Sequence, residues 1–265
     1  LGMSDARWNA LNEDASNPLM NRFVNTWVPG STFKGITAAV GVDAGIINPD
    51  ENLGYVGLSW QKDASWGDYH VTTLTDYGET VNLVNAMTYS DNIYFAREAL
   101  KIGADTMEEK LKSFGFEEEL PFDLTMQAST FDDDGKIDSE IQLADSGYGQ
   151  GEVLVNPLHL AALYTGFANN GNVISPYLLY KGNPEPKIWL EQAYTPEAAQ
   201  LIEKGLMQVI SSPHGTGYGA RREDISLAGK TGTAEIKLSK DDTSGTELGW
   251  FCIFTTQKDT KSPIL

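Results

Sequence analysis

The sequence predicts a mixed α/β (α+β) protein in which helices fill the middle of the chain and an antiparallel strand pair follows. Helix start and stop residues recur between residues 29 and 210. Two apolar runs, 225–237 and 249–256, flank a polar turn at 240–245, which is typical of a hairpin. Two strands need further partners to be stable, so we expect more sheet than these runs supply. Residues 262–265 would begin a third strand.

The helices are predicted from their end signals, in chain order. Pro29-Gly30-Ser31 opens the first helix and Gly45 stops it. Asp105 is expected to cap the fourth, and proline after Asn156 or Thr195 opens the last two. The expected helices cover residues 31–44, 82–89, 93–102, 105–115, 156–171 and 195–210. Residues 55–80 are expected to be irregular or a hairpin, and residues 117–140 an acidic loop.

Composition limits the class of protein. The 265 residues suit one large domain or two small ones, and 41% hydrophobic residues exclude a disordered chain. A formal charge of -18 argues against nucleic acid or an anionic membrane as the main partner. The single cysteine, Cys252, lies in an apolar run and is expected in the core, so neither a disulfide nor a cysteine zinc site is expected. No apolar stretch reaches the about 18 residues of a membrane span, and the start at Leu1 suggests a trimmed cytosolic protein or a domain cut from a longer chain.

The first candidate motif is Ser31-Thr32-Phe33-Lys34, at the start of a predicted helix. Residues i and i+3 share a helix face, so the Ser31 hydroxyl would lie beside the Lys34 amine. Serine needs a neighbouring base to act as a nucleophile, and a lysine can serve if its pKa is lowered. Alone, the motif is weak, because this spacing occurs often by chance and a capping serine with a surface lysine explains it better.

Ser90-Asp91-Asn92 interrupts an otherwise helical pattern and is the second candidate. Such polar triplets are common turns. A functional interpretation gives Ser90 a hydroxyl for proton relay, and Asn92 an amide that binds a substrate carbonyl or holds Lys34.

The third candidate is Lys230-Thr231-Gly232-Thr233, on a predicted strand. Glycine within a strand often marks the close approach of a ligand or of another backbone. A cation beside two hydroxyls suits a carboxylate. The alternative is an ordinary strand with an incidental glycine.

Together and in this order, S-x-x-K, S-D-N and K-T-G resemble the motif set of penicillin-binding proteins and class A β-lactamases. Nearly the whole chain is similar to class B penicillin-binding proteins, above all to the low-affinity subgroup associated with β-lactam resistance. The stretches that carry this likeness are 28–34, 60–67, 89–97, 144–152 and 229–235.

The resemblance implies the penicillin-binding-protein/β-lactamase-like transpeptidase fold, an antiparallel sheet flanked by helices with an all-helical subdomain. Residues 1–265 would form one transpeptidase domain, incomplete at both ends, with the upstream domains and a membrane anchor outside this sequence. The full-length protein would sit on the extracellular face of the bacterial cytoplasmic membrane. Unpaired sheet edges favour association, so aggregation in sedimentation is expected.

The resemblance also implies roles for the motif residues. Ser31 would attack the D-Ala-D-Ala carbonyl of a peptidoglycan stem peptide, and Lys34 would accept its proton. Ser90 would pass a proton to the leaving amine, while Asn92 would orient the substrate and the lysine. The residues implied in substrate binding are Lys230, Thr231, Gly232, Thr233, Tyr69 and Glu235, the last two in uncertain roles. The N–H groups of Ser31 and Thr233 would form an oxyanion hole.

A neighbouring stem peptide would then take the acyl group, and β-lactam antibiotics would acylate Ser31 as covalent inhibitors. Neither a cofactor nor a metal is expected, nucleic acid is not a partner, and cell-wall synthesis proteins are further candidate partners. Class A β-lactamases use a glutamate in Glu-x-x-Leu-Asn to activate water, but Leu-Asn occurs only at residues 11–12, before Ser31. This favours a transpeptidase. A hydrolysing β-lactamase and a penicillin-binding sensor domain remain the alternatives.

Three remaining features are assigned structural roles. His159 is expected to be half-buried within a helix, and no histidine is required as a base if Lys34 serves. The run 132–135 departs from a calcium loop at both ends and is expected to be an acidic turn. Trp60 and Trp66 are expected to anchor a loop or the core.

Overall fold

The structure is a computed structural model that describes residues 2–78, 80–179, 182, 185–236 and 246–256. Its helices are α1 (Asp5–Glu13), α2 (Lys34–Asp43), α3 (Leu83–Tyr89), α4 (Asn92–Ile102), α5 (Ala104–Ser113), α6 (Glu140–Ser146), α7 (Pro157–Ala168) and α8 (Pro196–Ser211). Its strands are β1 (Ser59–Trp60), β2 (Val71–Thr72), β3 (Val173–Ile174), β4 (Ile188–Leu190), β5 (Leu227–Ile236) and β6 (Thr246–Thr255). Four short 3-10 turns are η1 (Arg22–Val24), η2 (Gly30–Phe33), η3 (Ala64–Trp66) and η4 (Tyr218–Ala220).

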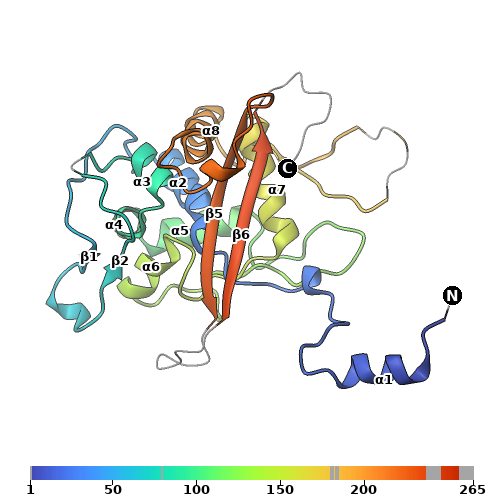
Figure 1. Ribbon diagram of the computed structural model, residues 1–265. Helices are drawn as coiled ribbons and strands as arrows, with labels where there is room; N and C mark the ends of the chain where they lie inside the picture. The colour runs from blue at the N-terminus through green and yellow to red at the C-terminus, as the bar shows by residue number, and fades with distance from the viewer. Residues whose placement is uncertain (1, 79, 180–181, 183–184, 237–245, 257–265) are drawn as a thin grey trace.

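The β5–β6 hairpin and two helical groups make up the body of the molecule (Figure 1). The two strands pair in antiparallel register from Leu227 with Thr255 to Ile236 with Thr246. Helix α8 packs on β5 and α7 contacts β6, while α4, α5 and α6 lie toward the small β1–β2 hairpin. Within the described residues the hairpin forms a two-stranded sheet, so the expected further strands stay a prediction.

Helix α2 runs through the centre of the molecule. It is buried from Lys34 to Gly41 and contacts α3, α4, α5 and α8. Its small and apolar residues on every side are typical of a helix enclosed by others. The turn η2, which carries Ser31, therefore leads directly into the core.

Most of the predicted elements are found where the end signals place them. Asn82, Asn156 and Thr195 cap α3, α7 and α8 with their side chains. The expected cap at Asp105 is wrong: α5 begins after Gly103, which has no side chain to cap it, and Asp105 lies inside the first turn. Helix α7 ends at Ala168, with Asn169 as its cap, before the predicted stop at Gly171. The predicted turn at 240–245 and the strand start at 262–265 lie outside the described residues.

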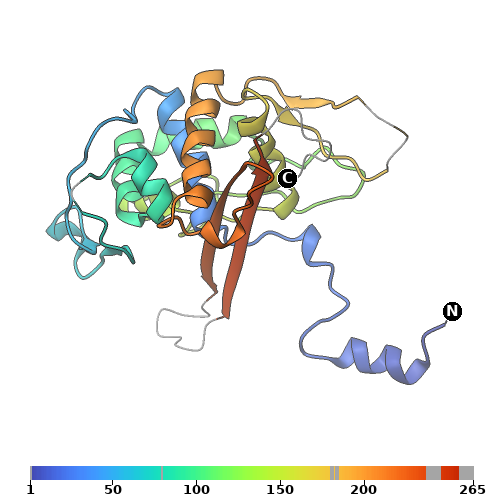
Figure 2. The same ribbon diagram turned by 45° about the horizontal axis from the view of Figure 1, so that its top comes forward.

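Three elements were not predicted. Helix α1 has no buried residue and extends away from the body (Figures 1 and 2). A helix without a buried face needs no apolar stripe, so its sequence carries no periodic pattern that would predict it. Helix α6 has only seven residues, and strands β3 and β4 have two and three. Elements this short leave little periodicity to detect.

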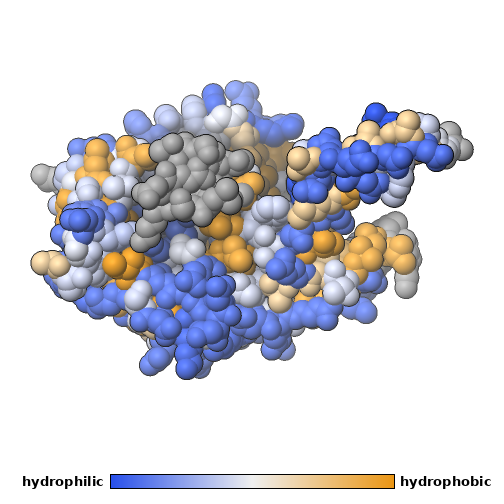
Figure 3. All heavy atoms as spheres, turned by 90° about the horizontal axis from the view of Figure 1, so that it is seen from below, coloured by the Kyte–Doolittle hydropathy of each residue, from blue (hydrophilic) through white to orange (hydrophobic). Residues whose placement is uncertain are grey.

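The surface mixes separate hydrophobic patches with a broad hydrophilic area, as the view from below shows (Figure 3). No helix in the described part of the chain has both the length and the apolar character to cross a membrane. Trp66 is buried and packs edge-on against Trp60, with ring centroids 5.5 Å apart, in keeping with the predicted anchor.

His159 in α7 is fully buried, more deeply than expected. Its Nε2 lies 2.9 Å from the Phe114 carbonyl and its Nδ1 lies 2.8 Å from Ser129 Oγ. A neutral ring satisfies both contacts by donating to the carbonyl and accepting from the hydroxyl. Burial lowers the pKa of His159 to about 4.

Because this pKa lies below its usual value of 6.5, protonation of His159 favours the unfolded chain. We expect the free energy of unfolding to fall by about 2 kcal/mol between pH 7 and pH 5 from this residue. Urea unfolding of the parent and of His159→Gln at both pH values measures it. Equal pH dependence in the two proteins would contradict the assignment.

Candidate active site

Ser31 lies in the 3-10 turn η2, directly before α2, rather than capping the helix. Gly30 has φ 53°, a left-handed conformation that favours glycine, and its N–H donates to the Gly149 carbonyl at 2.9 Å. A Cβ on Gly30 would lie 2.4 Å from the Thr233 carbonyl oxygen of β5. The backbones of residues 30, 149 and 233 therefore converge around Ser31.

The Lys34 side chain is fully buried and joins two of the predicted motifs. Its Nζ lies 2.9 Å from Ser31 Oγ, as the i, i+3 spacing predicts. It also lies 2.7 Å from the Ser90 carbonyl, 3.0 Å from Ser90 Oγ and 2.7 Å from Asn92 Oδ1. The capping-serine and surface-lysine interpretation is therefore wrong.

Ser90 ends α3 in a left-handed conformation, with φ 58° and ψ 47°. A residue other than glycine holds such a conformation at a cost of about 1–3 kcal/mol, which its surroundings must offset. Here Asp91 caps α4 by accepting from the N–H groups of Ile93 and Tyr94. The turn directs both the carbonyl and the hydroxyl of Ser90 at Lys34.

Lys230 completes the cluster from β5. Its Nζ donates to Ser90 Oγ at 2.9 Å and to the Thr231 carbonyl at 3.1 Å. Burial lowers the pKa of Lys230 to about 7. Burial, and next the charge of Lys230, lower the pKa of Lys34 well below its ordinary value, while Asp91 acts in the opposite direction.

A cavity of about 400 Å³ opens in front of these groups. Its lining residues come from all three motifs and from the loops between them: Ser31, Leu74, Thr75, Tyr89, Ser90, Asn92, Tyr148, Gln150, Thr216, Thr231, Gly232 and Thr233. Thr216, Thr231 and Thr233 line the β5 side, and Thr231 Oγ1 donates to Thr216 Oγ1 at 2.6 Å. Side chains alternate along a strand, and Lys230 accordingly lies behind the cavity, on Ser90.

Gly232 explains how β5 can lie so close to η2, the turn that carries Ser31. A Cβ at this position would lie 2.9 Å from the Pro29 carbonyl and 3.0 Å from the Thr32 nitrogen. The strand glycine thus marks the close approach of another backbone, one of the two meanings that the sequence left open.

Tyr69 and Glu235 have weaker links to the cavity. The Tyr69 hydroxyl donates to Asp145, which also accepts from the Tyr148 hydroxyl, so Tyr69 supports the cavity wall from behind. The backbone of Glu235 pairs with Glu247, and its side chain lies outside the described part of the structure.

Sequence reasoning missed several lining residues. Leu74 and Thr216 carry no local motif, because they reach the cavity only through the packing of distant segments, whereas Tyr89 directly precedes Ser90 in the stretch 89–97. Tyr148 and Gln150 belong to the stretch 144–152, which contributed to the family resemblance without an assigned role.

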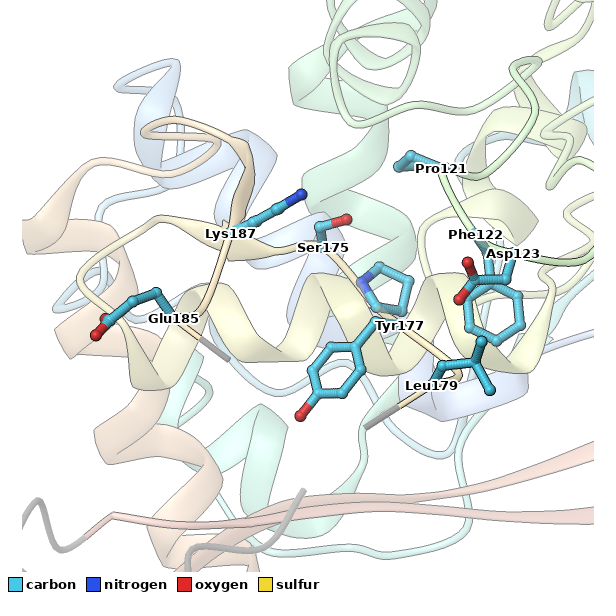
Figure 4. A pocket seen from close by; sticks show the side chains of 9 residues that line it. Pro121, Phe122, Asp123, Ser175, Tyr177, Leu179, Glu185 and Lys187 are labelled. Atoms are coloured by element: carbon cyan, nitrogen blue, oxygen red, sulfur yellow. The ribbon is translucent and has the colours of Figure 1, made fainter. Parts of the chain in front are cut away.

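A second cavity, of about 480 Å³, lies apart from the predicted site residues (Figure 4). Phe122 and Asp123 border one side, while Ser175, Tyr177 and Lys187 come from the β3–β4 region. In the described part of the chain, no group of three or more His, Cys, Asp or Glu residues is placed to hold a metal ion.

Comparison with known proteins agrees with this geometry. The family model described as the penicillin binding protein transpeptidase domain matches residues 2–264. Penicillin-binding protein 3 of Bacillus subtilis is 47% identical over 250 residues, which cover 94% of this chain and 37% of that protein. The peptidoglycan D,D-transpeptidase PbpA of Mycolicibacterium smegmatis is 28% identical, over 96% of this chain and 52% of its own length. The chain thus spans about half or less of these relatives.

Solved structures share the fold. Penicillin-binding protein A of M. tuberculosis, as a ceftriaxone acyl-enzyme complex, superposes with a TM-score of 0.79 at 25% identity. That match covers 94% of this chain and 56% of the other. Together with the family model and the relatives, it confirms the predicted fold and family: the chain belongs to the class B penicillin-binding protein transpeptidase domains.

Proposed function

We propose that this domain is a serine D,D-transpeptidase that crosslinks peptidoglycan stem peptides through an acyl-enzyme on Ser31. The observation that carries the proposal is the position of Lys34 Nζ, 2.9 Å from Ser31 Oγ and in contact with Ser90 and Asn92. A nucleophile beside a buried amine with a lowered pKa is the arrangement that acyl transfer requires.

The hydrogen-bond partners of the Lys34 amine indicate which group can act as the base toward Ser31. A neutral lysine amine has two N–H donors and one lone pair. The Ser90 carbonyl and Asn92 Oδ1, both 2.7 Å away, can only accept and therefore take the two donors. The lone pair can then accept a hydroxyl proton, and Ser31 Oγ at 2.9 Å and Ser90 Oγ at 3.0 Å both lie within reach, which supports Lys34 as the general base for Ser31.

The other groups handle the substrate. The N–H groups of Ser31 and Thr233 form the oxyanion hole of the mechanism, and both residues line the cavity. The hydroxyls of Thr216, Thr231 and Thr233 receive the terminal carboxylate, with the Lys230 charge one layer behind.

In the acylation step, Ser31 Oγ bonds to the D-alanyl carbonyl carbon and the peptide C–N bond breaks. The leaving D-alanine amine takes a proton from Ser90, which the adjacent Lys230 ammonium replaces. The amine of a second stem peptide then attacks the ester and forms the crosslink; its proton returns through Ser90 to Lys230, and Ser31 leaves with the proton that Lys34 holds. A β-lactam follows only the first step, because its leaving nitrogen stays attached to the acyl group.

The fate of the acyl-enzyme separates a transpeptidase from a hydrolase. Among the described residues that line the cavity there is no aspartate or glutamate to activate water. This supports slow hydrolysis and transfer to an amine instead, in agreement with the missing Glu-x-x-Leu-Asn stretch. A penicillin-binding sensor would share the slow hydrolysis but would not form crosslinks.

Further parts of the proposal rest on the family resemblance. They are membership of the low-affinity, β-lactam-resistance-associated subgroup, a place on the extracellular face of the cytoplasmic membrane, cell-wall synthesis partners, and upstream domains with an anchor in the full-length protein. Slow acylation by benzylpenicillin would support the subgroup.

Incubation with benzylpenicillin should add the mass of the whole drug to the parent and leave Ser31→Ala unmodified, because the Ser31 oxygen forms the ester. Intact mass spectrometry measures the adduct, and we expect it to persist for hours. Rapid loss of the adduct with drug turnover would identify a β-lactamase. A folded sample without any adduct, even at high drug concentration, would refute the proposal.

The acylation rate should show a bell-shaped dependence on pH. It rises with pH as Lys34 loses its proton and becomes a base, and it falls above about pH 7 as Lys230 loses the proton that Ser90 relays. Adduct formation followed between pH 5 and pH 10 gives the profile. A rate that climbs steadily to pH 10 would contradict the role of Lys230.

A further inference from the structure

Tyr77 touches both residues that flank Ser90, although it belongs to none of the three motifs. Its hydroxyl donates to Asp91 Oδ2 at 2.6 Å. Its ring stacks on Tyr89 with centroids 4.5 Å apart and an interplanar angle of 6°. One side chain thus holds the residues on either side of the left-handed serine.

The backbone conformation of Ser90 sets the positions of the groups that contact both buried lysines. Ser90 combines a left-handed backbone with contacts from both buried lysines. A rotation of its backbone would move the carbonyl away from Lys34, and with it the acceptor that orients the amine toward Ser31. Asp91 is 4% exposed, and its other carboxylate oxygen already caps α4, so the Tyr77 hydroxyl completes the partners of this buried group.

The chain segment around Tyr77 also reaches the third residue of the motif. The Thr72 carbonyl accepts from Asn92 Nδ2 at 2.9 Å, which turns Asn92 Oδ1 toward Lys34. Residues 72–77 therefore hold Asn92 at one end and Asp91 at the other. The stack continues from Tyr89 to His214, with centroids 5.8 Å apart, and so links this segment to the loop that carries Thr216.

We propose that Tyr77 is a positioning residue for acylation, which fixes the Ser90 turn through Asp91 and Tyr89 and thereby aims the two lysines. The proposal rests on the proposed function, because it assumes that Lys34 and Ser90 serve Ser31. Tyr77 itself lies outside the residues that line the cavity and touches no reacting atom.

Two variants separate the contacts of Tyr77. Tyr77→Phe keeps the ring and removes the hydroxyl, and Tyr77→Leu removes both. Small displacements of catalytic groups cost up to about 100-fold in rate, so we expect acylation by a fluorescent penicillin to slow about tenfold in the first variant and about 100-fold in the second. Tyr194→Phe is the matched control, because it also loses a buried tyrosine hydroxyl bond, from Tyr194 to the Leu163 carbonyl at 3.3 Å, away from the cavity. It should acylate at the parent rate.

All rates are measured well below the thermal midpoint of each variant, so that unfolded protein does not contribute. A double-mutant cycle with Ser90→Ala then tests the route: this variant removes the Ser90 hydroxyl and keeps its carbonyl, so Tyr77→Phe should slow acylation by clearly less than the tenfold expected in the parent. Tyr77→Phe acylating at the parent rate would overturn the proposal, as would an equal tenfold loss in Tyr194→Phe or an undiminished loss in the Ser90→Ala background. Absence of acylation in the parent would instead overturn the proposed function.

Discussion

Two buried amines share one hydroxyl oxygen, and the site depends on this constraint. Lys34 and Lys230 lie 3.0 and 2.9 Å from Ser90 Oγ. Away from water, two neighbouring positive charges disfavour each other, so the cluster favours a state in which one amine is neutral. Two groups that can only accept, the Ser90 carbonyl and Asn92 Oδ1, lie 2.7 Å from the Lys34 amine and orient it. In the proposed mechanism the geometry of Ser90 thereby controls the reactivity of Ser31, 59 positions earlier in the chain.

Each wall of the cavity is supported by a carboxylate that tyrosine hydroxyls bind. On one wall Asp91 accepts from Tyr77, and on the other Asp145 accepts from Tyr69 and Tyr148. Burial raises the pKa of Asp145, while the two hydroxyl donors act against that increase. Neutral phenol donors let a carboxylate lie near the site without an additional cation to compete with the two lysines.

The parts of the fold that the sequence predicts are those with local signals. Asn82, Asn156 and Thr195 each announce a helix, and the spacing of Ser31 and Lys34 already places their side chains together. The left-handed conformation of Ser90 and its contact with Lys230 could not be predicted, because a contact across 140 positions depends on how β5 packs against α3. Helix α1 was not predicted for a different reason, since none of its residues is buried among the described parts of the chain.

The close contact between Gly30 and Thr233 has a consequence for folding. The two residues are 203 positions apart, yet a single added methyl group would not fit between their backbones. A contact of such high sequence separation closes a long loop, and the entropy cost of that closure must be offset before the contact forms. A covalent label on Ser31 would therefore count molecules in which these two distant segments have come together, and time-resolved labelling during refolding would report when they do.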